Sequence, residues 1–360
     1  MKQKLPSTPG PIGVFDSGYG GLTILSKIRE ALPEYDYIYL GDNARAPYGT
    51  RSFEVVYEFT LQAVTKLFEM GCHLVILACN TASAKALRSI QINDLPHLDL
   101  ARRVLGVIRP TVECIGNITR SRHVGVLATG GTIKSESYPL EIHKLFPDIK
   151  VSGEACPLWV SLVENNEAQG DGTDYFVRKY INELLAKDRE IDTAILGCTH
   201  YPILLPKIRK YMPESITIVS QGKLVADSLK DYLHRHPEID AQCTRNGKCS
   251  YYTTEAEDKF TESASIFLNE AVLLHSLNIP EIIGDDIGCH RIAFAVIDQI
   301  TSASVKLRQI QLETSVFFFA DSHRCISVII TQDRKCIVKK IRDHNTPQFS
   351  RFCRFIRIHF

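Results

Sequence analysis

Two cysteines of the chain stand in matching surroundings and have a side chain that can carry a proton. Cys79 lies in LACNTASA and Cys198 in LGCTHYP, where each follows an apolar run and precedes hydroxyl or amide side chains. Asn80, Thr81 and Ser83 are residue types that begin helices, and a helix N-terminus lowers the pKa of a thiol by favouring the thiolate. A single buried cysteine is usually inert packing, but two in parallel settings favour a shared function.

Two thiols on opposite walls of a cleft would suit the inversion of a carbon centre. One thiolate would remove a proton from one face of a substrate carbon, and the other thiol would return a proton to the opposite face. Thiols fit this task because a general acid or base works best with a pKa near the operating pH. Asp16 and His200 are the candidates for adjusting the two thiols.

The elements that position these residues follow from an alternation of short apolar runs with helix-length segments. The strand candidates are rich in Val, Ile, Leu or Tyr and cover residues 12–15, 37–40, 74–77, 104–107, 124–127, 151–154, 193–196, 216–219 and 250–253. The helix candidates include residues 53–69, 82–92, 173–186 and 224–233. This alternation predicts an α/β fold with mainly parallel sheets flanked by helices, which bind ligands at the carboxyl ends of their strands.

The pattern of strand and polar loop occurs twice, with one cysteine loop in each half. We therefore expect two similar domains that face each other, with the active site in the cleft between them. The first domain would comprise residues 10–105 and 214–284 on the Cys79 side, and the second residues 106–213 on the Cys198 side. Residues 285–360 would form a C-terminal extension.

Composition limits the class of protein and its partners. A net charge of +1 argues against a general nucleic-acid binder, and no apolar run reaches the roughly 18 residues of a membrane span. The N-terminus lacks the apolar core of a signal peptide, so we expect a cytoplasmic protein without a membrane partner. The 11 cysteines would then be thiols, and none has the CxxC spacing of a structural zinc site.

Two glycine-rich segments give weaker indications of a binding site. DSGYGGL is similar to a phosphate-binding turn, but it matches neither GxGxxG nor GxxxxGK[ST] and gives little support to a nucleotide site. The GGT at residues 130–132 opens a predicted helix and would suit an anion such as a carboxylate.

Six segments together resemble the glutamate racemases of the aspartate/glutamate racemase superfamily. In chain order these are FDSGYGGL, GDNARAPYG, ACNTASA, TIKSESY, ACPLWVSLVE and LGCTHYPIL, and they lie within roughly residues 10 to 270. The broader superfamily shares only the two cysteine segments, so the other four favour glutamate over aspartate or hydantoins. The resemblance implies interconversion of L- and D-glutamate without pyridoxal phosphate, metal or other cofactor, which would supply D-glutamate for peptidoglycan and cell-wall biogenesis.

The resemblance also assigns residues. Cys79 and Cys198 would be the acid/base thiols, with Asp16 assisting Cys79 and His200 assisting Cys198. The residues that would hold or lie near the substrate are Ser17, Asp42, Tyr48, Gly49, Asn80, Thr81, Thr132, Glu164 and Thr199.

The chain departs from the family at several positions. Tyr19 stands where Val is usual and Asn43 where Thr is frequent, but neither change removes a group that the chemistry needs. Asn165 and Asn166 follow Glu164 where the family often has a second Glu and a Gly. The short N-terminus lacks the extension of members activated by a peptidoglycan precursor, so we do not expect such activation.

The extension after Gly284 is rich in Lys, Arg and aromatic residues and exceeds the usual family length. We favour a segment without function, or one that is not a native product, over a basic module that binds a partner. The alternatives for the whole chain are a related racemase acting on aspartate or another amino acid, and a non-catalytic amino-acid-binding protein. A homodimer stays open.

Overall fold

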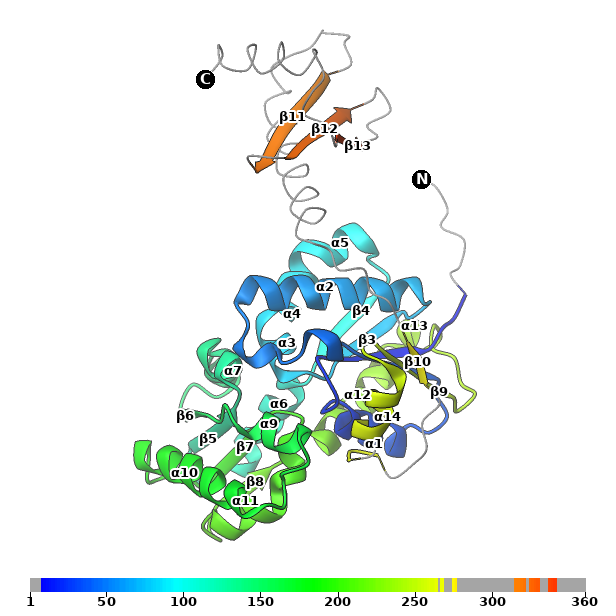
Figure 1. Cartoon of the computed structure of the whole chain (residues 1–360). Helices are drawn as coiled ribbons and strands as arrows, with labels where there is room; N and C mark the ends of the chain where they lie inside the picture. The colour runs from blue at the N-terminus through cyan, green and yellow to red at the C-terminus, as the bar shows by residue number, and fades with distance from the viewer. Residues whose placement is uncertain are drawn as a thin grey trace. The chain divides into compact units, whose positions relative to one another are not determined.

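The computed structural model describes residues 8–264, 266–268, 274–276, 314–321, 324–330 and 336–341. The chain divides into two compact units, residues 1–279 and 280–360. The first unit contains two parallel sheets flanked by helices (Figure 1). The fold class expected from the sequence is therefore confirmed for this unit.

The first sheet has six parallel strands in the order β10-β9-β2-β1-β3-β4. Its strands are β1 (Ile12–Asp16), β2 (Tyr37–Gly41), β3 (Leu74–Leu77), β4 (Arg103–Gly106), β9 (Cys249–Thr253) and β10 (Leu274–Ser276). Its helical segments are α1 (Leu22–Ala31), η1 (Asn43–Arg45), η2 (Tyr48–Thr50), α2 (Phe53–Glu69), α3 (Asn80–Lys85), α4 (Leu87–Ser89), η3 (Ile90–Asp94), α5 (Leu95–Leu98), α12 (Gln221–Arg235), α13 (Pro237–Asp240) and α14 (Glu257–Ala264).

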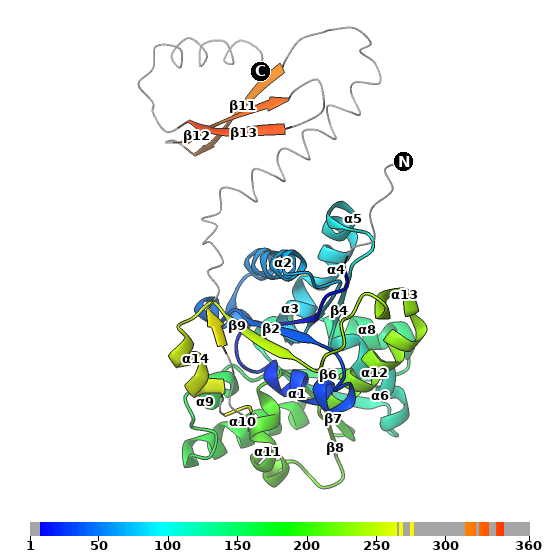
Figure 2. The ribbon, with the colours of Figure 1, turned by 90° about the vertical axis from the view of Figure 1, so that its right-hand side faces the viewer.

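Both faces of this sheet are covered, which explains the continuous apolar runs of its strands. Successive side chains of β1 point to opposite faces. Val14 packs in the core shared with α1 and α12, and Phe15 in the core shared with α2. Figure 2 shows α2 on one side of the sheet and α1 with α12 on the other.

The single helix expected at residues 82–92 is instead a series of short segments. Helix α3 begins earlier, at Asn80, and ends before Ala86, whose φ of −114° departs from helical geometry. The chain then forms α4, the π-helical η3 and α5. The apolar period of the sequence predicted a helix here, but it could not locate this interruption.

The second sheet has four parallel strands in the order β6-β5-β7-β8. These are β5 (His123–Ala128), β6 (Lys150–Ala155), β7 (Thr193–Gly197) and β8 (Thr217–Val219). The accompanying helical segments are α6 (Ile108–Ile118), α7 (Gly130–Lys134), α8 (Ser137–Leu145), α9 (Trp159–Glu164), α10 (Asp171–Lys187), η4 (Tyr201–Leu204) and α11 (Leu205–Tyr211). β8 pairs with β7 although it lies beyond residue 213, so the chain leaves this sheet later than the expected domain boundary.

The chain crosses between the two sheets twice. It passes from β4 to β5 through α6, and it returns from β8 to β9 through α12. Helix α12 packs against α6 and also against α1 of the first sheet. The two crossings therefore pack against each other.

The second unit contains a three-stranded antiparallel sheet in the order β11-β12-β13. Its strands are β11 (Thr314–Asp321), β12 (Arg324–Ile330) and β13 (Cys336–Ile341). The other residues of the expected extension lie outside the described ranges. Across the described part of the whole chain, the helices are too short or too polar to cross a bilayer.

Candidate active site

Both cysteines singled out in the sequence line one cavity. Cys79 follows β3 and Cys198 follows β7, so the thiols come from the carboxyl ends of strands in opposite sheets. Their exposed fractions are only 5% and 6%. The structure thus brings together two residues that lie far apart in the sequence, as the repeated strand-and-loop pattern predicted.

Most of the other expected site residues line the same cavity. Those found there are Ser17, Tyr48, Gly49, Asn80, Thr81, Glu164, Thr199 and His200. The lining also contains residues that the sequence analysis did not assign, namely Ala46, Pro47, Thr129 and Val160. Ala46 and Pro47 belong to the GDNARAPYG segment and Thr129 to the loop after β5, so the rim rule could have found them. Three expected residues, Asp16, Asp42 and Thr132, are buried but are not among the lining residues.

Cys79 is the N-cap of α3. Its sulfur accepts a hydrogen bond from the backbone N–H of Ala82 at 3.4 Å and lies 3.3 Å from the hydroxyl of Ser17. Burial raises the pKa of this thiol to about 12, and the nearby Asp16 carboxylate adds to the shift. The expectation that the helix N-terminus would lower this pKa is wrong for Cys79, because desolvation outweighs the hydrogen bonds.

Asp16 lies at the end of β1 with 1% of its surface exposed. Its Oδ2 accepts the backbone N–H of Gly18 at 2.9 Å. Burial raises the pKa of Asp16 more than the neighbouring His200 and this N–H lower it. Asp16 is therefore a buried carboxyl group close to both Cys79 and His200, without lining the cavity itself.

Cys198, His200 and Glu164 are connected in that order by two side-chain contacts. The sulfur of Cys198 is 3.8 Å from Nδ1 of His200, and Nε2 of His200 is 2.9 Å from Oε1 of Glu164. Burial lowers the pKa of His200, but the hydrogen bonds to Cys198 and Glu164 outweigh burial and raise it to about 10. These contacts therefore favour the charged imidazole, which can direct one N–H to each partner.

The loop after Glu164 explains one departure of the sequence. Asn166 has a φ of 58°, which is the left-handed region. Glycine adopts this conformation most readily, and Asn is among the few other residues that tolerate it. Asn166 can therefore take the place of a glycine without moving Glu164 away from His200.

Three threonine hydroxyls form a cluster at one side of the cavity. Thr81 Oγ1 lies 3.0 Å from that of Thr129 and 3.4 Å from that of Thr132, and the latter two are 3.1 Å apart. Thr129 also caps α7 by accepting the backbone N–H of Thr132. Thr132 thus contacts the cavity through its neighbours, and the cluster offers hydroxyl donors to an anionic group.

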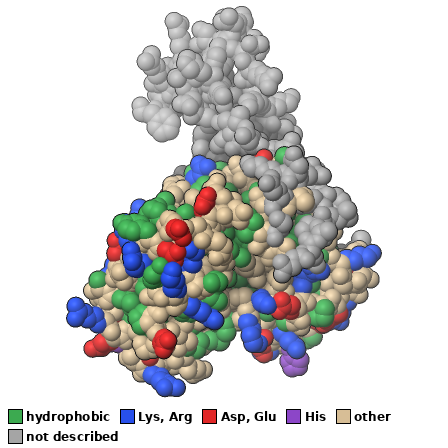
Figure 3. Space-filling view, turned by 60° about the horizontal axis from the view of Figure 1, so that its bottom comes forward, with side chains coloured by type: hydrophobic (Ala, Val, Ile, Leu, Met, Phe, Trp, Pro, Cys, Tyr) green, Lys and Arg blue, Asp and Glu red, His purple; other side chains and the backbone are tan. Residues whose placement is uncertain are grey.

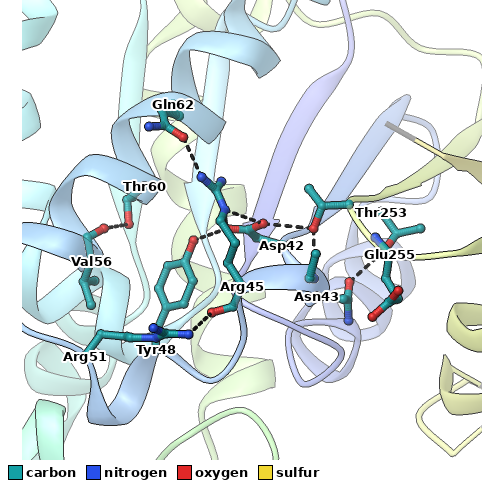
Figure 4. Close-up of polar contacts among 12 residues, drawn as sticks. Asp42, Asn43, Arg45, Tyr48, Arg51, Val56, Thr60, Gln62, Thr253 and Glu255 are labelled. Atoms are coloured by element: carbon teal, nitrogen blue, oxygen red, sulfur yellow. Dashed lines mark hydrogen bonds and ion pairs between the residues drawn. The ribbon is translucent and has the colours of Figure 1, made fainter. Parts of the chain in front are cut away.

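Asp42 is fully buried, and its carboxylate accepts hydrogen bonds from neighbouring side chains (Figure 4). Its carboxylate accepts two hydrogen bonds from Arg45 Nε, at 2.9 and 2.7 Å, one from Thr254 Oγ1 at 2.9 Å and a short one from the Tyr48 hydroxyl. Arg45 is held in turn by Gln62 at 2.5 Å. Asp42 therefore orients Tyr48, which lines the cavity, instead of facing the cavity itself.

Comparison with known proteins identifies the family. The family model described as Asp/Glu/Hydantoin racemase matches residues 12–229, which include every cavity-lining residue. This chain belongs to the Asp/Glu/hydantoin racemase family. The chain is therefore an amino-acid racemase, which is a kind of isomerase, as the six sequence segments predicted.

Many of the proteins similar to this chain are glutamate racemases. That of Ruegeria sp. (strain TM1040) is 38% identical over 273 residues, which cover 72% of this chain and 97% of the relative. The glutamate racemase isoform RacE1 from Bacillus anthracis has 34% identity and a TM-score of 0.69, over 75% of this chain and 98% of its own. The structure from Francisella tularensis, in complex with D-glutamate, has 34% identity and a TM-score of 0.67, over 76% and 99%. The resemblance drawn from the sequence is confirmed.

Within the described ranges, no group of three His, Cys, Asp or Glu side chains is placed to hold a metal ion. On the face drawn in Figure 3, Lys and Arg side chains are interspersed with Asp and Glu and do not form one basic surface.

Proposed function

We propose that the chain interconverts L- and D-glutamate by two-base proton transfer between the thiols of Cys79 and Cys198. The observation that carries this proposal is that Cys79 and Cys198 both line one cavity and follow strands of different sheets. A glutamate held between them would present the two faces of its α-carbon to the two thiols.

The proton balance of the reaction is simple. One cysteine acts as thiolate and takes the α-proton from one face, which leaves a carbanion stabilised by the adjacent carboxylate. The other cysteine acts as thiol and gives its proton to the opposite face. After one turnover the two sulfurs have exchanged protonation states, and the reverse reaction restores them. Charged His200 beside Cys198 and the carboxyl group of Asp16 near Cys79 would ease these changes.

The remaining polar groups would hold the substrate. Ser17, Tyr48, Gly49, Asn80, Thr81 and Thr199 line the cavity and offer hydroxyl, amide and backbone groups to the ammonium and the two carboxylates. Thr132 and Asp42 would act through Thr81 and Tyr48. The proposal includes the role implied by the family resemblance, a cytoplasmic supply of D-glutamate for peptidoglycan.

The test is to incubate the purified full-length chain with L-glutamate and with L-aspartate separately and to follow optical rotation. We expect the rotation of L-glutamate to decay to zero, with little change for L-aspartate. Decay with aspartate alone would contradict the choice of substrate. No decay with either amino acid would contradict racemisation and favour a binding protein.

A further inference from the structure

A closed ring of hydrogen bonds lies behind the Cys79 side of the cavity. The hydroxyl of Tyr138 donates to Oδ1 of Asn80 at 2.8 Å, and Nδ2 of Asn80 donates to Oε1 of Gln221 at 2.6 Å. Nε2 of Gln221 completes the ring by donating to the oxygen of Tyr138 at 2.9 Å. Each of the three residues is 2% exposed, so water does not compete for these groups.

The direction of the hydrogen bonds in this ring follows from one backbone carbonyl. Nε2 of Gln221 also lies 3.1 Å from the carbonyl oxygen of Val107 and 3.0 Å from Oγ1 of Thr111, so its two N–H groups are shared among three acceptors. A backbone carbonyl only accepts, so the NH₂ of Gln221 must face Val107 and its Oε1 must face Asn80. It follows that the NH₂ of Asn80 faces Gln221, and that its Oδ1 is occupied by Tyr138.

The ring also connects the cavity with the two chain crossings. Gln221 is the first residue of α12, the returning crossing, and Val107 directly precedes α6, the outgoing one. Asn80 is the first residue of α3, next to Cys79, and is one of the residues that line the cavity. Tyr138 comes from α8, one of the helices that accompany the second sheet. One glutamine side chain thus touches both crossings and a residue of the site.

We propose that Gln221 is a positioning residue for the racemisation, which rests on the function proposed above. By fixing the amide of Asn80, Gln221 makes Asn80 a donor toward the cavity, because its carbonyl oxygen is already taken and its NH₂ has a second N–H. A donor at this place suits a carboxylate oxygen of the substrate. An Asn80 amide in the opposite orientation would present its carbonyl oxygen, which would repel the same group.

The test compares Gln221→Met with Thr111→Val in the full-length chain. Both variants remove a buried polar group from the same cluster, but Thr111 contacts Gln221 and Val107 and not Asn80. We expect Gln221→Met to raise KM for both enantiomers of glutamate by about tenfold or more, since one hydrogen bond to a charged group is lost. kcat should fall by less. Thr111→Val should leave KM within about twofold while lowering Tm to a similar extent.

An unchanged KM in Gln221→Met, with the same loss of Tm as Thr111→Val, would overturn the proposal and leave the ring a packing feature. If Gln221→Met does not fold, Tyr138→Phe removes a single ring hydroxyl and should raise KM in the same direction; an unchanged KM there would equally overturn it. Calorimetric binding of D-glutamate separates this inference from the function. A chain that binds D-glutamate without racemising it contradicts the proposed function, while the ratio of Kd between Gln221→Met and the unsubstituted chain still decides the role of Gln221.

Discussion

The two thiols differ in their immediate neighbours, and this difference governs how each handles a proton. Cys79 lies beside the hydroxyl of Ser17 and near the buried carboxyl of Asp16, and burial holds its proton in place. Cys198 lies beside His200, whose pKa is raised to about 10 by its hydrogen bonds to Cys198 and Glu164. The sequence singled out Asp16 and His200 as the residues that adjust the two thiols, but the direction of each effect depends on burial and on contacts between distant residues.

Glu164→Gln tests the charged state of His200. The carboxylate is one of the groups that raise the pKa of His200 to about 10, so its removal lowers that pKa. We expect kcat/KM of the unsubstituted chain to hold at neutral pH and to fall as the pH rises through about 10. In Glu164→Gln this fall should begin at least about one pH unit lower. The exposed Glu167→Gln is the matched control, and an alkaline limb identical in all three proteins would contradict the assignment.

The same shift has a consequence for stability. Because folding raises the pKa of His200 above its ordinary value of 6.5, the folded state binds this proton more tightly than the unfolded one. The resulting stabilisation is complete below about pH 6.5 and disappears as the pH rises through about 10.

At the scale of elements, the turn between β1 and α1 brings the first sheet against the loop that carries His200. A Cβ on Gly20 would lie 2.3 Å from Oγ1 of Thr199 and 2.4 Å from Nδ1 of His200. Oγ1 of Thr23 also donates to the carbonyl of Thr199 at 3.0 Å. Gly20 of the DSGYGG segment is thus explained by the close approach of the two halves of the site, without a phosphate-binding role.

Gly20→Ala should therefore displace Thr199 and His200 and lower kcat by on the order of 100-fold, since small misplacements of reacting groups are costly. Gly172→Ala is the matched control, because Gly172 lies exposed near the start of α10 and a Cβ there would have no atom within 4 Å. That control should leave kcat unchanged and should stabilise the fold by up to about 1 kcal/mol. Equal kcat in both variants would contradict this role of the turn.

The elements that the sequence predicted best are the buried parallel strands and the loops after them. Both faces of such strands are apolar, so their residue pattern is continuous and easily recognised, and the carboxyl-end rule places their loops on one rim. Gln221 was not predicted, because a polar residue at the start of a helix is ordinary. Its partners Asn80 and Tyr138 lie 141 and 83 positions away, and no local pattern reveals such contacts.

At the scale of the whole molecule, the site and the second unit are separate in sequence. Every cavity-lining residue lies between Ser17 and His200, and the family match ends at residue 229. The described strands of the second unit form an antiparallel sheet of their own. The groups that the proposed chemistry uses therefore all precede residue 279.

A chain ending at Ile279 should consequently retain kcat and KM for glutamate within about twofold. Thermal unfolding of the first unit, followed by circular dichroism, should occur at the Tm it has in the full-length chain. A large loss of activity, or a Tm several degrees lower, would contradict this prediction and give the second unit a role in the enzyme.

The most direct test of the two-thiol mechanism is racemisation of L-glutamate in deuterated water, followed at the α-carbon in the first fraction of turnover. We predict that newly formed D-glutamate carries deuterium, that the remaining L-glutamate carries almost none, and that Cys79→Ala and Cys198→Ala each abolish the conversion. Deuterium entering L-glutamate as fast as D-glutamate forms, or near-normal racemisation by either variant, would contradict it.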